Sequence, residues 1–141
     1  MKPPPIIDPD VKAVFAGHDP ATRKTLKTLR ATIYAAAVSA PDIGPLTETL
    51  KWGQLSYHPE KPRVGTTVRI DRSSNPEAAA ALFVPCQTNL LETFRNRYPD
   101  TFTYAGKRAI ELDHNWQDRT AELQHCIALA LSYHLCKANH A

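Results

Sequence analysis

The sequence has no long apolar run, no block of one charge and only three cysteines. Its uncharged stretches, such as those from Ala31 to Pro41 and from Ala78 to Leu91, are all too short to cross a bilayer, so we expect no membrane partner. Lys and Arg number 17 against 14 Asp and Glu, for a net charge of +3, and they form no basic tail or block. We therefore expect no nucleic-acid partner. The segment from Met1 to Pro5 lacks the apolar stretch of a signal peptide, which favours a cytoplasmic protein.

Recognisable catalytic and metal-binding motifs are also missing. Cys86, Cys126 and Cys136 fit neither a CxxC redox pair nor a zinc ribbon, and an odd number cannot all pair within one chain. We expect three free thiols in a reducing cytoplasm. The patterns HxxxH, HExxH, GxGxxG and GxSxG and the phosphate-binding Walker A loop do not occur. The sequence thus predicts no metal site and no cofactor, and it favours a binding protein over an enzyme.

What is present fits one domain over residues 1–141, with a proline-rich arm over residues 1–7. Asp-Pro pairs have the pattern of an N-cap followed by the first helical residue. Asn-x-x-Glu and Asn-x-x-Asp spacings resemble capping boxes before two later helices. The first two predicted helices run from Asp8–Pro9 to Gly17 and from Asp19–Pro20 to about Ala40, and a helical turn follows from Leu46 towards Lys51. Two later helices are predicted from Thr88 or Asn89 to Pro99 and from Asn115 to about Ala138. His134 is expected on the apolar face of the last helix.

Strand patterns fill the middle of the chain. From Val64 to Ile70 apolar or β-branched residues alternate with Gly65, Thr67 and Arg69, which predicts a half-buried strand with a polar outer face. The predicted strands are 54–58, 64–71, 79–86, 101–104 and 108–112, with hairpins joining the first two and the last two. Helices, then strands with one inserted helix, then a final helix predict an α+β fold with a central antiparallel sheet packed with helices.

Several polar and aromatic residues from different segments form the candidate ligand site. If they converge, they make a positively charged pocket with a helix N-terminus pointing in. The alternative, which periodicity alone favours, is that they are scattered over the surface. The candidate ligand-binding residues are Lys51, Trp52, Gln54, Ser56, Tyr57, Arg69, Cys86, Gln87, Thr88, Arg95 and Arg108.

Within this candidate site, we expect Trp52 at the end of a short helical turn to form an apolar wall with Tyr57 beside it. Outward-facing Arg69 supplies a charge near that wall, and the backbone N–H groups of residues 86–88 close the pocket. A separate basic stripe of Arg23, Lys27, Arg30 and Tyr34 on the second helix is interpreted as a solvated flank, with anion binding as the alternative.

Five blocks of sequence carry a resemblance to a known family. They are ExLKWGQxSY at 48–57, GTTVR at 65–69, CQTxL at 86–90, FRxxYP at 94–99 and YxGxRAI at 104–110. This succession resembles the YdhG-like family, a bacterial domain of unknown function, although Leu55 stands where that family tends to have proline. The resemblance implies a central antiparallel sheet packed with helices and no established reaction. Some relatives are described as frataxin-like iron chaperones.

These observations lead to a function hypothesis with two alternatives. The first hypothesis is a binding domain with little or no catalytic activity, whose partner is a small anionic molecule held by Lys51, Arg69, Arg95 and Arg108. One alternative is a thiol enzyme using Cys86, since a helix N-terminus lowers a thiol pKa. The other is an iron chaperone, implied only by the resemblance, and the chain has no acidic cluster for iron. A homo-oligomer remains open.

Overall fold

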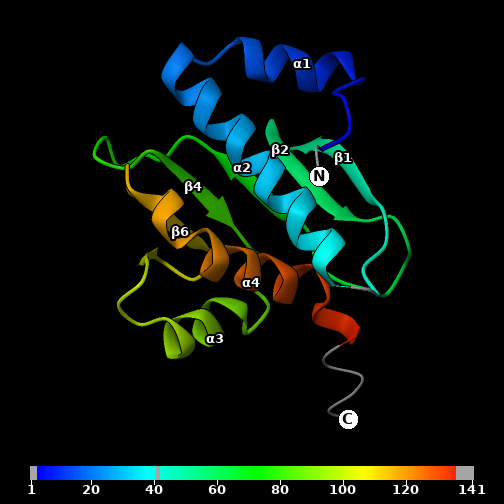
Figure 1. Ribbon diagram of the computed structural model, residues 1–141, viewed down its shortest axis with the longest axis vertical. Coiled ribbons are helices and arrows are strands. Elements are labelled where there is room, and N and C mark those ends of the chain that lie inside the picture. Colours follow the sequence, from blue (N-terminus) through cyan, green and yellow to red (C-terminus); the bar gives the residue numbers. More distant parts are fainter. Residues whose placement is uncertain (1–2, 41, 136–141) are drawn as a thin grey trace.

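The computed structural model describes residues 3–40 and 42–135, and these form one sheet with helices packed on it (Figure 1). The elements in chain order are α1 (Pro9–Ala16), α2 (Pro20–Ser39), β1 (Leu46–Lys51), β2 (Gln54–Pro59), β3 (Val68–Asp71), β4 (Ala80–Phe83), α3 (Leu90–Arg97), β5 (Thr103–Ala105), β6 (Ala109–Leu112), the 3₁₀ helix η1 (Trp116–Arg119) and α4 (Thr120–Leu131). The strand order is β1-β2-β3-β4-β6-β5 and every neighbouring pair is antiparallel. The predicted α+β fold with an antiparallel sheet is confirmed.

The first two helices begin where their Asp-Pro signals predict. The Asp8 carboxylate accepts a hydrogen bond from the backbone N–H of Asp10 at 2.8 Å, and Asp19 accepts one from the N–H of Thr22 at 3.0 Å. Each cap satisfies an N–H that has no partner inside the helix, while the following proline already has a helical φ. Local chemistry alone therefore sets both starts.

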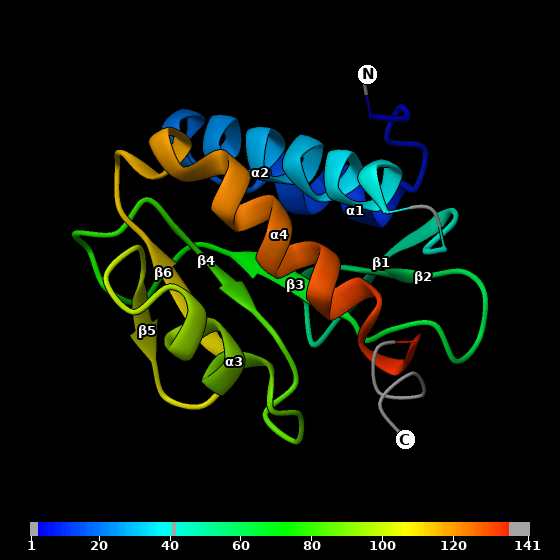
Figure 2. The same cartoon turned by 60° about the horizontal axis from the view of Figure 1, so that its bottom comes forward.

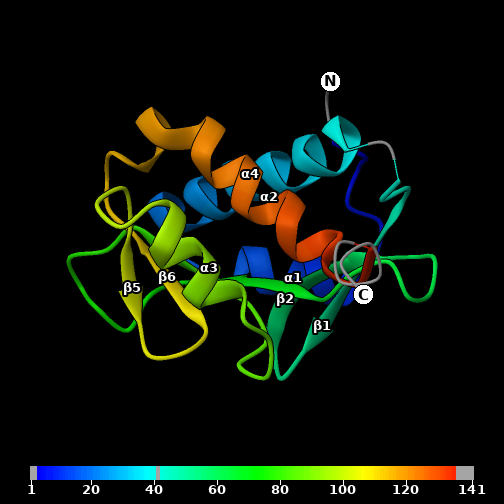
Figure 3. The ribbon, with the colours of Figure 1, turned by 90° about the horizontal axis from the view of Figure 1, so that it is seen from below.

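The two faces of the sheet are very different. The helices lie over one face, as Figures 2 and 3 show from two directions. Leu55 and Tyr57 of β2 point towards them and pair with Ile70 and Val68 of β3, all four being buried. Side chains alternate between faces along a strand, so the intervening residues point to the opposite face. None of the helices in the described ranges covers that opposite face, which we call the open face.

The predicted helical turn after Leu46 is wrong, because these residues form the edge strand β1. Thr49 lies opposite Ser56 and Lys51 opposite Gln54, so the strand pairs with β2 along its whole length. Two β-branched threonines suit a pleated, half-buried surface, and pairing with a neighbouring strand outweighs a weak local helical signal. The strand also places Trp52 in a hairpin turn rather than at the end of a helix.

The segment predicted as one strand from 64 to 71 becomes a strand only at Val68. Before that point the backbone leaves the sheet and docks on the last helix. Both the backbone N–H and the hydroxyl of Thr66 donate to the carbonyl of Ala130 at 2.9 Å, and the N–H of His134 donates to the carbonyl of Val64 at 3.0 Å. The first two bonds use the carbonyl of Ala130 near the end of α4, and the third uses a backbone N–H that follows α4. The segment before β3 is therefore held on the helix rather than in the sheet.

The predicted caps of the later helices have different outcomes. Of the two candidates for α3, Asn89 makes no side-chain cap, whereas the Thr88 hydroxyl accepts from the N–H of Leu90 at 3.3 Å. Asn115 makes none either, because the chain first forms the 3₁₀ helix η1, which buries Trp116, and α4 begins only at Thr120. His134 is exposed rather than part of an apolar face, and the predicted end near 138 lies outside the described residues. Within those residues, no helix combines the length and apolar character needed to span a membrane.

Gly65 is required where the segment before β3 meets α4. A Cβ atom built on this glycine would lie 1.9 Å from the carbonyl oxygen of Leu131. Because that oxygen belongs to the backbone, the clash cannot be relieved by rotating a side chain. We expect Gly65→Ala to lower the free energy of unfolding by about 3 kcal/mol, since the added methyl group forces the segment off the helix. Chemical denaturation followed by circular dichroism measures the loss.

The matched control is Gly17→Ala. Gly17 has a φ of −76°, and its added Cβ would meet only ordinary contacts, the nearest at 3.4 Å from the carbonyl oxygen of Ala13. We expect the free energy of unfolding of this variant to lie within about 0.5 kcal/mol of that of the parent protein. Equal stability of the two variants would contradict the close approach at Gly65.

Candidate functional site

A hollow of about 410 Å³ on the open face of the sheet gathers charged and aromatic side chains. It is lined by Trp52, Gln54, Arg69, Phe83 and Arg108, and we call it the sheet-face hollow. Arg69 of β3 lies directly opposite Phe83 of β4, and Phe83 lies opposite Ala109 at the start of β6. Residues paired in this way share a face of the sheet. Four segments far apart in the sequence therefore meet there only because of the strand order.

Trp52 is the most unusual residue of the hollow. Together with Gly53 it forms the two-residue turn between β1 and β2, with φ values of 56° and 77°. Positive φ at both positions is the hairpin geometry that normally selects Asn-Gly, and a bulky residue there costs about 1–2 kcal/mol. The side chain is also 91% exposed. Backbone strain and exposure of a large aromatic ring both oppose folding, and such strain gathers at functional sites.

Arg69 and Arg108 supply the charge. They come from β3 and from the residue before β6, so β4 lies between them. Neither guanidinium has a carboxylate within ion-pair distance among residues 3–40 and 42–135. No acidic residue lines the hollow, so two positive charges face solvent without a protein counter-charge.

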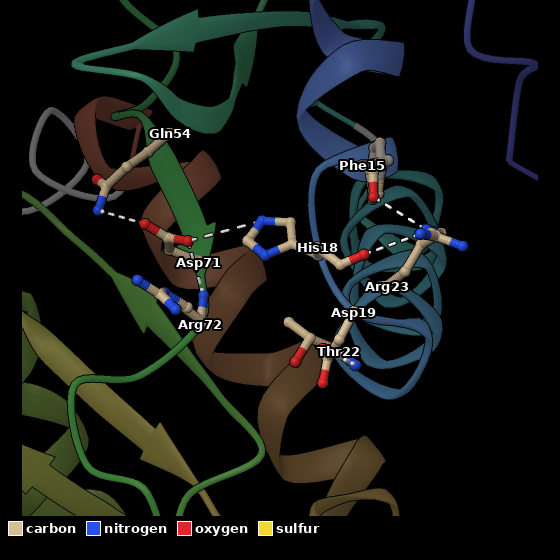
Figure 4. Close-up of polar contacts among 8 residues, drawn as sticks. All are labelled: Phe15, His18, Asp19, Thr22, Arg23, Gln54, Asp71 and Arg72. Carbon is tan, nitrogen blue, oxygen red and sulfur yellow. Dashed lines mark hydrogen bonds and ion pairs between the residues drawn. The ribbon is translucent and has the colours of Figure 1, made fainter.

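Gln54 is the neutral polar group of the hollow, and a carboxylate holds it in place. Its amide donates to Asp71 Oδ2 at 3.2 Å, while Asp71 Oδ1 lies 3.9 Å from His18 Nε2 (Figure 4). The N–H of Arg72 also donates to Asp71 Oδ1, at 2.7 Å. Asp71 is thus bonded to neighbours on both sides, and within the described residues it forms no ion pair with Arg69 or Arg108.

A second hollow, of about 510 Å³, lies at the turn between α1 and α2, near His18 and Arg72. Asp19 contributes its carboxylate to the lining, and its hydrogen bonds with Thr22 lower the pKa of that carboxyl. The same carboxylate caps α2. This hollow therefore has its own negative charge beside Arg72 and no excess of positive charge for an anion.

Beneath the hairpin that carries Trp52, a buried ion pair joins β1 to α2. Arg30 donates from Nε and Nη2 to the two oxygens of Glu48, at 2.5 and 3.1 Å, and the Tyr57 hydroxyl donates to Glu48 Oε2 at 2.7 Å. The guanidinium also lies 4.9 Å from the centre of the Tyr34 ring. A bidentate pair with its remaining lone pairs satisfied is the arrangement that tolerates burial.

The pKa values in this network follow from burial and from the ion pair. Burial favours the neutral form of Arg30, but the hydrogen bonds and charge of Glu48 outweigh it and raise the arginine pKa. Burial first, and then the nearby carboxylate, raise the pKa of Tyr57 far above its ordinary value. Tyr57 therefore stays a neutral hydroxyl donor, and Arg30 stays charged.

Of the predicted ligand-binding residues, Trp52, Gln54, Arg69 and Arg108 meet in the sheet-face hollow. The expected wall of Trp52 with Tyr57 beside it is wrong: Tyr57 is fully buried on the helix-covered face, bound to Glu48. Side chains alternate between the two faces of a strand, so Tyr57 points to the same face as Leu55, which is the face packed against the helices.

Ser56 and Lys51 also lie outside the lining. Ser56 shares the open face but is fully buried, and its hydroxyl donates to the carbonyl of Gln54. Lys51 is exposed and its ammonium group donates to the hydroxyl of Thr67 at 3.4 Å.

The helix start at residues 86–88 does not close this hollow. The N–H of Thr88 donates to the carbonyl of Pro85, and neither Cys86 nor Gln87, both exposed, belongs to the lining. Arg95 of α3 is used elsewhere, donating to the carbonyl of Gly106 at 2.8 Å. The expected contribution of backbone N–H donors is therefore wrong, because residues 86–88 lie outside the lining and the N–H of Thr88 is bonded within the turn.

Phe83 is the lining residue that sequence reasoning missed. The segment 79–86 has a nearly continuous apolar pattern, which predicts a central strand. In the structure, Leu82 is fully buried whereas Phe83 is half-buried on the open face, opposite Arg69. The alternation that separates them was present in the sequence, but only the strand register shows that the face carrying Phe83 is uncovered.

The basic stripe predicted on α2 does not form a solvated flank. Arg30 is buried in the ion pair with Glu48. Arg23 donates to the carbonyls of Phe15, Ala16 and His18, so it caps the end of α1 (Figure 4). Two of the four predicted stripe residues thus have structural roles. Lys27 is exposed, and with Arg23 and Lys12 it lines a separate hollow of about 340 Å³ beside α1.

Both described cysteines are free thiols. Cys86 is exposed and Cys126 is buried, and burial raises the pKa of the Cys126 thiol to about 12. Cys136 lies outside the described residues. Over the same part of the chain, no group of three or more His, Cys, Asp or Glu side chains is arranged to hold a metal ion.

Comparison with known proteins gives no match: no family model, curated protein or solved structure resembles this chain closely enough to be significant. The function must therefore be argued from the geometry itself.

Glu48 is expected to be essential for stability because its removal leaves Arg30 charged and buried. We predict that Glu48→Gln lowers the free energy of unfolding by about 3 kcal/mol, as broken buried pairs do. Glu60→Gln is the control, since Glu60 is exposed and its side chain has no partner in the described structure. Urea denaturation of both variants measures the difference, and equal stabilities would contradict a structural role for the pair.

Proposed function

We propose that the protein binds a small anionic ligand in the sheet-face hollow. The observation that carries this proposal is the meeting of Arg69 and Arg108 on the open face, with no ion pair to either among the described residues. Charge-assisted hydrogen bonds from a guanidinium to an anion contribute about 1.5–3 kcal/mol each. An anion between the two arginines would supply the counter-charge that the described chain does not.

Binding is favoured over catalysis by the chemistry of the lining. Tryptophan, glutamine, phenylalanine and two arginines include no nucleophile and no group that exchanges a proton near neutral pH. The lining supplies recognition through charge, one amide and two aromatic rings. A role in capturing, carrying or sensing a small molecule follows from such a set.

The two alternative functions have less support. Cys86 is exposed but stands outside the hollow, while Cys126 is buried with a raised pKa that opposes thiolate formation. Iron binding needs a cluster of hard oxygen ligands, and the described residues offer no such group. We retain the YdhG-like resemblance and a cytoplasmic location as parts of the proposal, the latter because an exposed free thiol suits a reducing compartment.

The proposal predicts that Arg69→Ala and Arg108→Ala each weaken binding of methyl phosphate at least tenfold, from the loss of one charge-assisted contact. The measurement is a two-dimensional NMR titration that follows the side-chain amide of Gln54. Arg97→Ala is the control, because Arg97 is an exposed arginine on α3 outside the hollow. Equal affinities for all three variants, or no binding by the parent protein, would contradict the proposal.

A further inference from the structure

Resting on the proposed function, we infer that the ligand of the sheet-face hollow is an aromatic anion. Its ring contacts Trp52 and Phe83, and its carboxylate or phosphate group contacts Arg69 and Arg108. The first support is the composition of the lining, which pairs two aromatic rings with two cations. An inorganic anion would use the arginines alone and leave both rings without a role.

Trp52 is the strongest single argument for a ring in the ligand. It occupies a left-handed backbone position that asparagine or glycine fills at lower cost, and it leaves 91% of its surface in solvent. The protein's other tryptophan, Trp116, is 2% exposed. A strained and exposed indole gains nothing within the described fold, whereas it gains stacking and apolar contact when a planar group covers it.

Phe83 offers a second surface of the same kind. It lies on the open face of β4, half-buried, and no aromatic ring contact to it or to Trp52 occurs within the described ranges. Its neighbours on that face include Ala109 across the strand pair and Ala81 two residues earlier on the same strand. Phe83 lines the sheet-face hollow, so a flat group that enters the hollow can reach its ring.

The charges lie close to these rings rather than in a separate site. Arg69 is the direct cross-strand neighbour of Phe83, and Arg108 precedes Ala109, which pairs with Phe83 from the other side. A ligand that touches the Phe83 ring is therefore within reach of both guanidiniums. This juxtaposition selects molecules in which the anionic group is carried on or near the ring, the chemistry shared by aromatic acids, aryl phosphates and nucleotides.

The test compares phenyl phosphate with methyl phosphate, which has the same anionic group without the ring. NMR titration follows the side-chain amide of Gln54, which every variant keeps, with the indole N–H of buried Trp116 as an internal reference. We expect phenyl phosphate to bind about tenfold more tightly than methyl phosphate. Trp52→Ala should abolish this preference, whereas Arg69→Ala should weaken both ligands equally.

Phe83→Leu provides a second variant that keeps an apolar side chain in β4, and it should also reduce the preference for phenyl phosphate. Equal binding of the two phosphates by the parent protein would overturn the aromatic ligand and leave the anion site standing. Failure of both to bind would overturn the proposed function as well. A preference that survives Trp52→Ala and Phe83→Leu would overturn the assigned ring contacts.

A further pair, adenosine monophosphate and ribose 5-phosphate, distinguishes the two sources of an aromatic anion. The ratio of the affinities within this pair measures the contribution of the adenine ring. If that ratio exceeds the ratio for phenyl and methyl phosphate, the result supports a nucleotide. A smaller gain supports a compact aromatic acid, whose ring and charge are only a few bonds apart. A gain from neither ring overturns the inference.

Discussion

The buried pair between Arg30 and Glu48 holds the first hairpin against helix α2, and the candidate site depends on that hairpin. Glu48 lies in the middle of the edge strand β1, which has a sheet neighbour on one side only. Without the bonds from Arg30 and Tyr57, a carboxylate would be buried under the helix at a cost that β1 could not offset. With them, the strand is fixed in register, and the turn that carries Trp52 is fixed with it.

Because side chains alternate along each strand, one face of the sheet contributes to the core and the other carries the candidate binding residues. One face supplies Leu55, Tyr57 and Ile70 to the core beneath the helices. The other face supplies Arg69 and Phe83 to an uncovered surface. Because the two sets alternate along the same strands, the open face can change its charge and its rings while the core remains intact. Binding residues on such a face rest on a rigid support, which favours a preformed site.

Trp52 shows how the two requirements meet at one position. Its conformation opposes folding, and the ion pair beneath the hairpin offsets that cost elsewhere in the same element. The ring is then presented next to two arginines that have no protein counter-charge in the described chain. Backbone strain, an exposed ring and unpaired positive charge therefore occur at one place. The proposed aromatic anion would cover the Trp52 ring and pair with the two arginines.

The features that could be predicted from the residues rest on short-range chemistry. The Asp-Pro signals at residues 8–9 and 19–20 set the helix starts, and the alternation around Val68 and the order of segments set the α+β class. Arg69 could be placed on an outward face because period-two patterning is local. Three other features could be found only from the folded chain: Leu46–Lys51 is a strand, Arg30 pairs with Glu48, and Phe83 lies on the face without helices. Each of these depends on which strand lies beside which, and on where the helices pack. Pairing across dozens of residues overrides local propensity, because buried contacts contribute more free energy than the preference of any one residue.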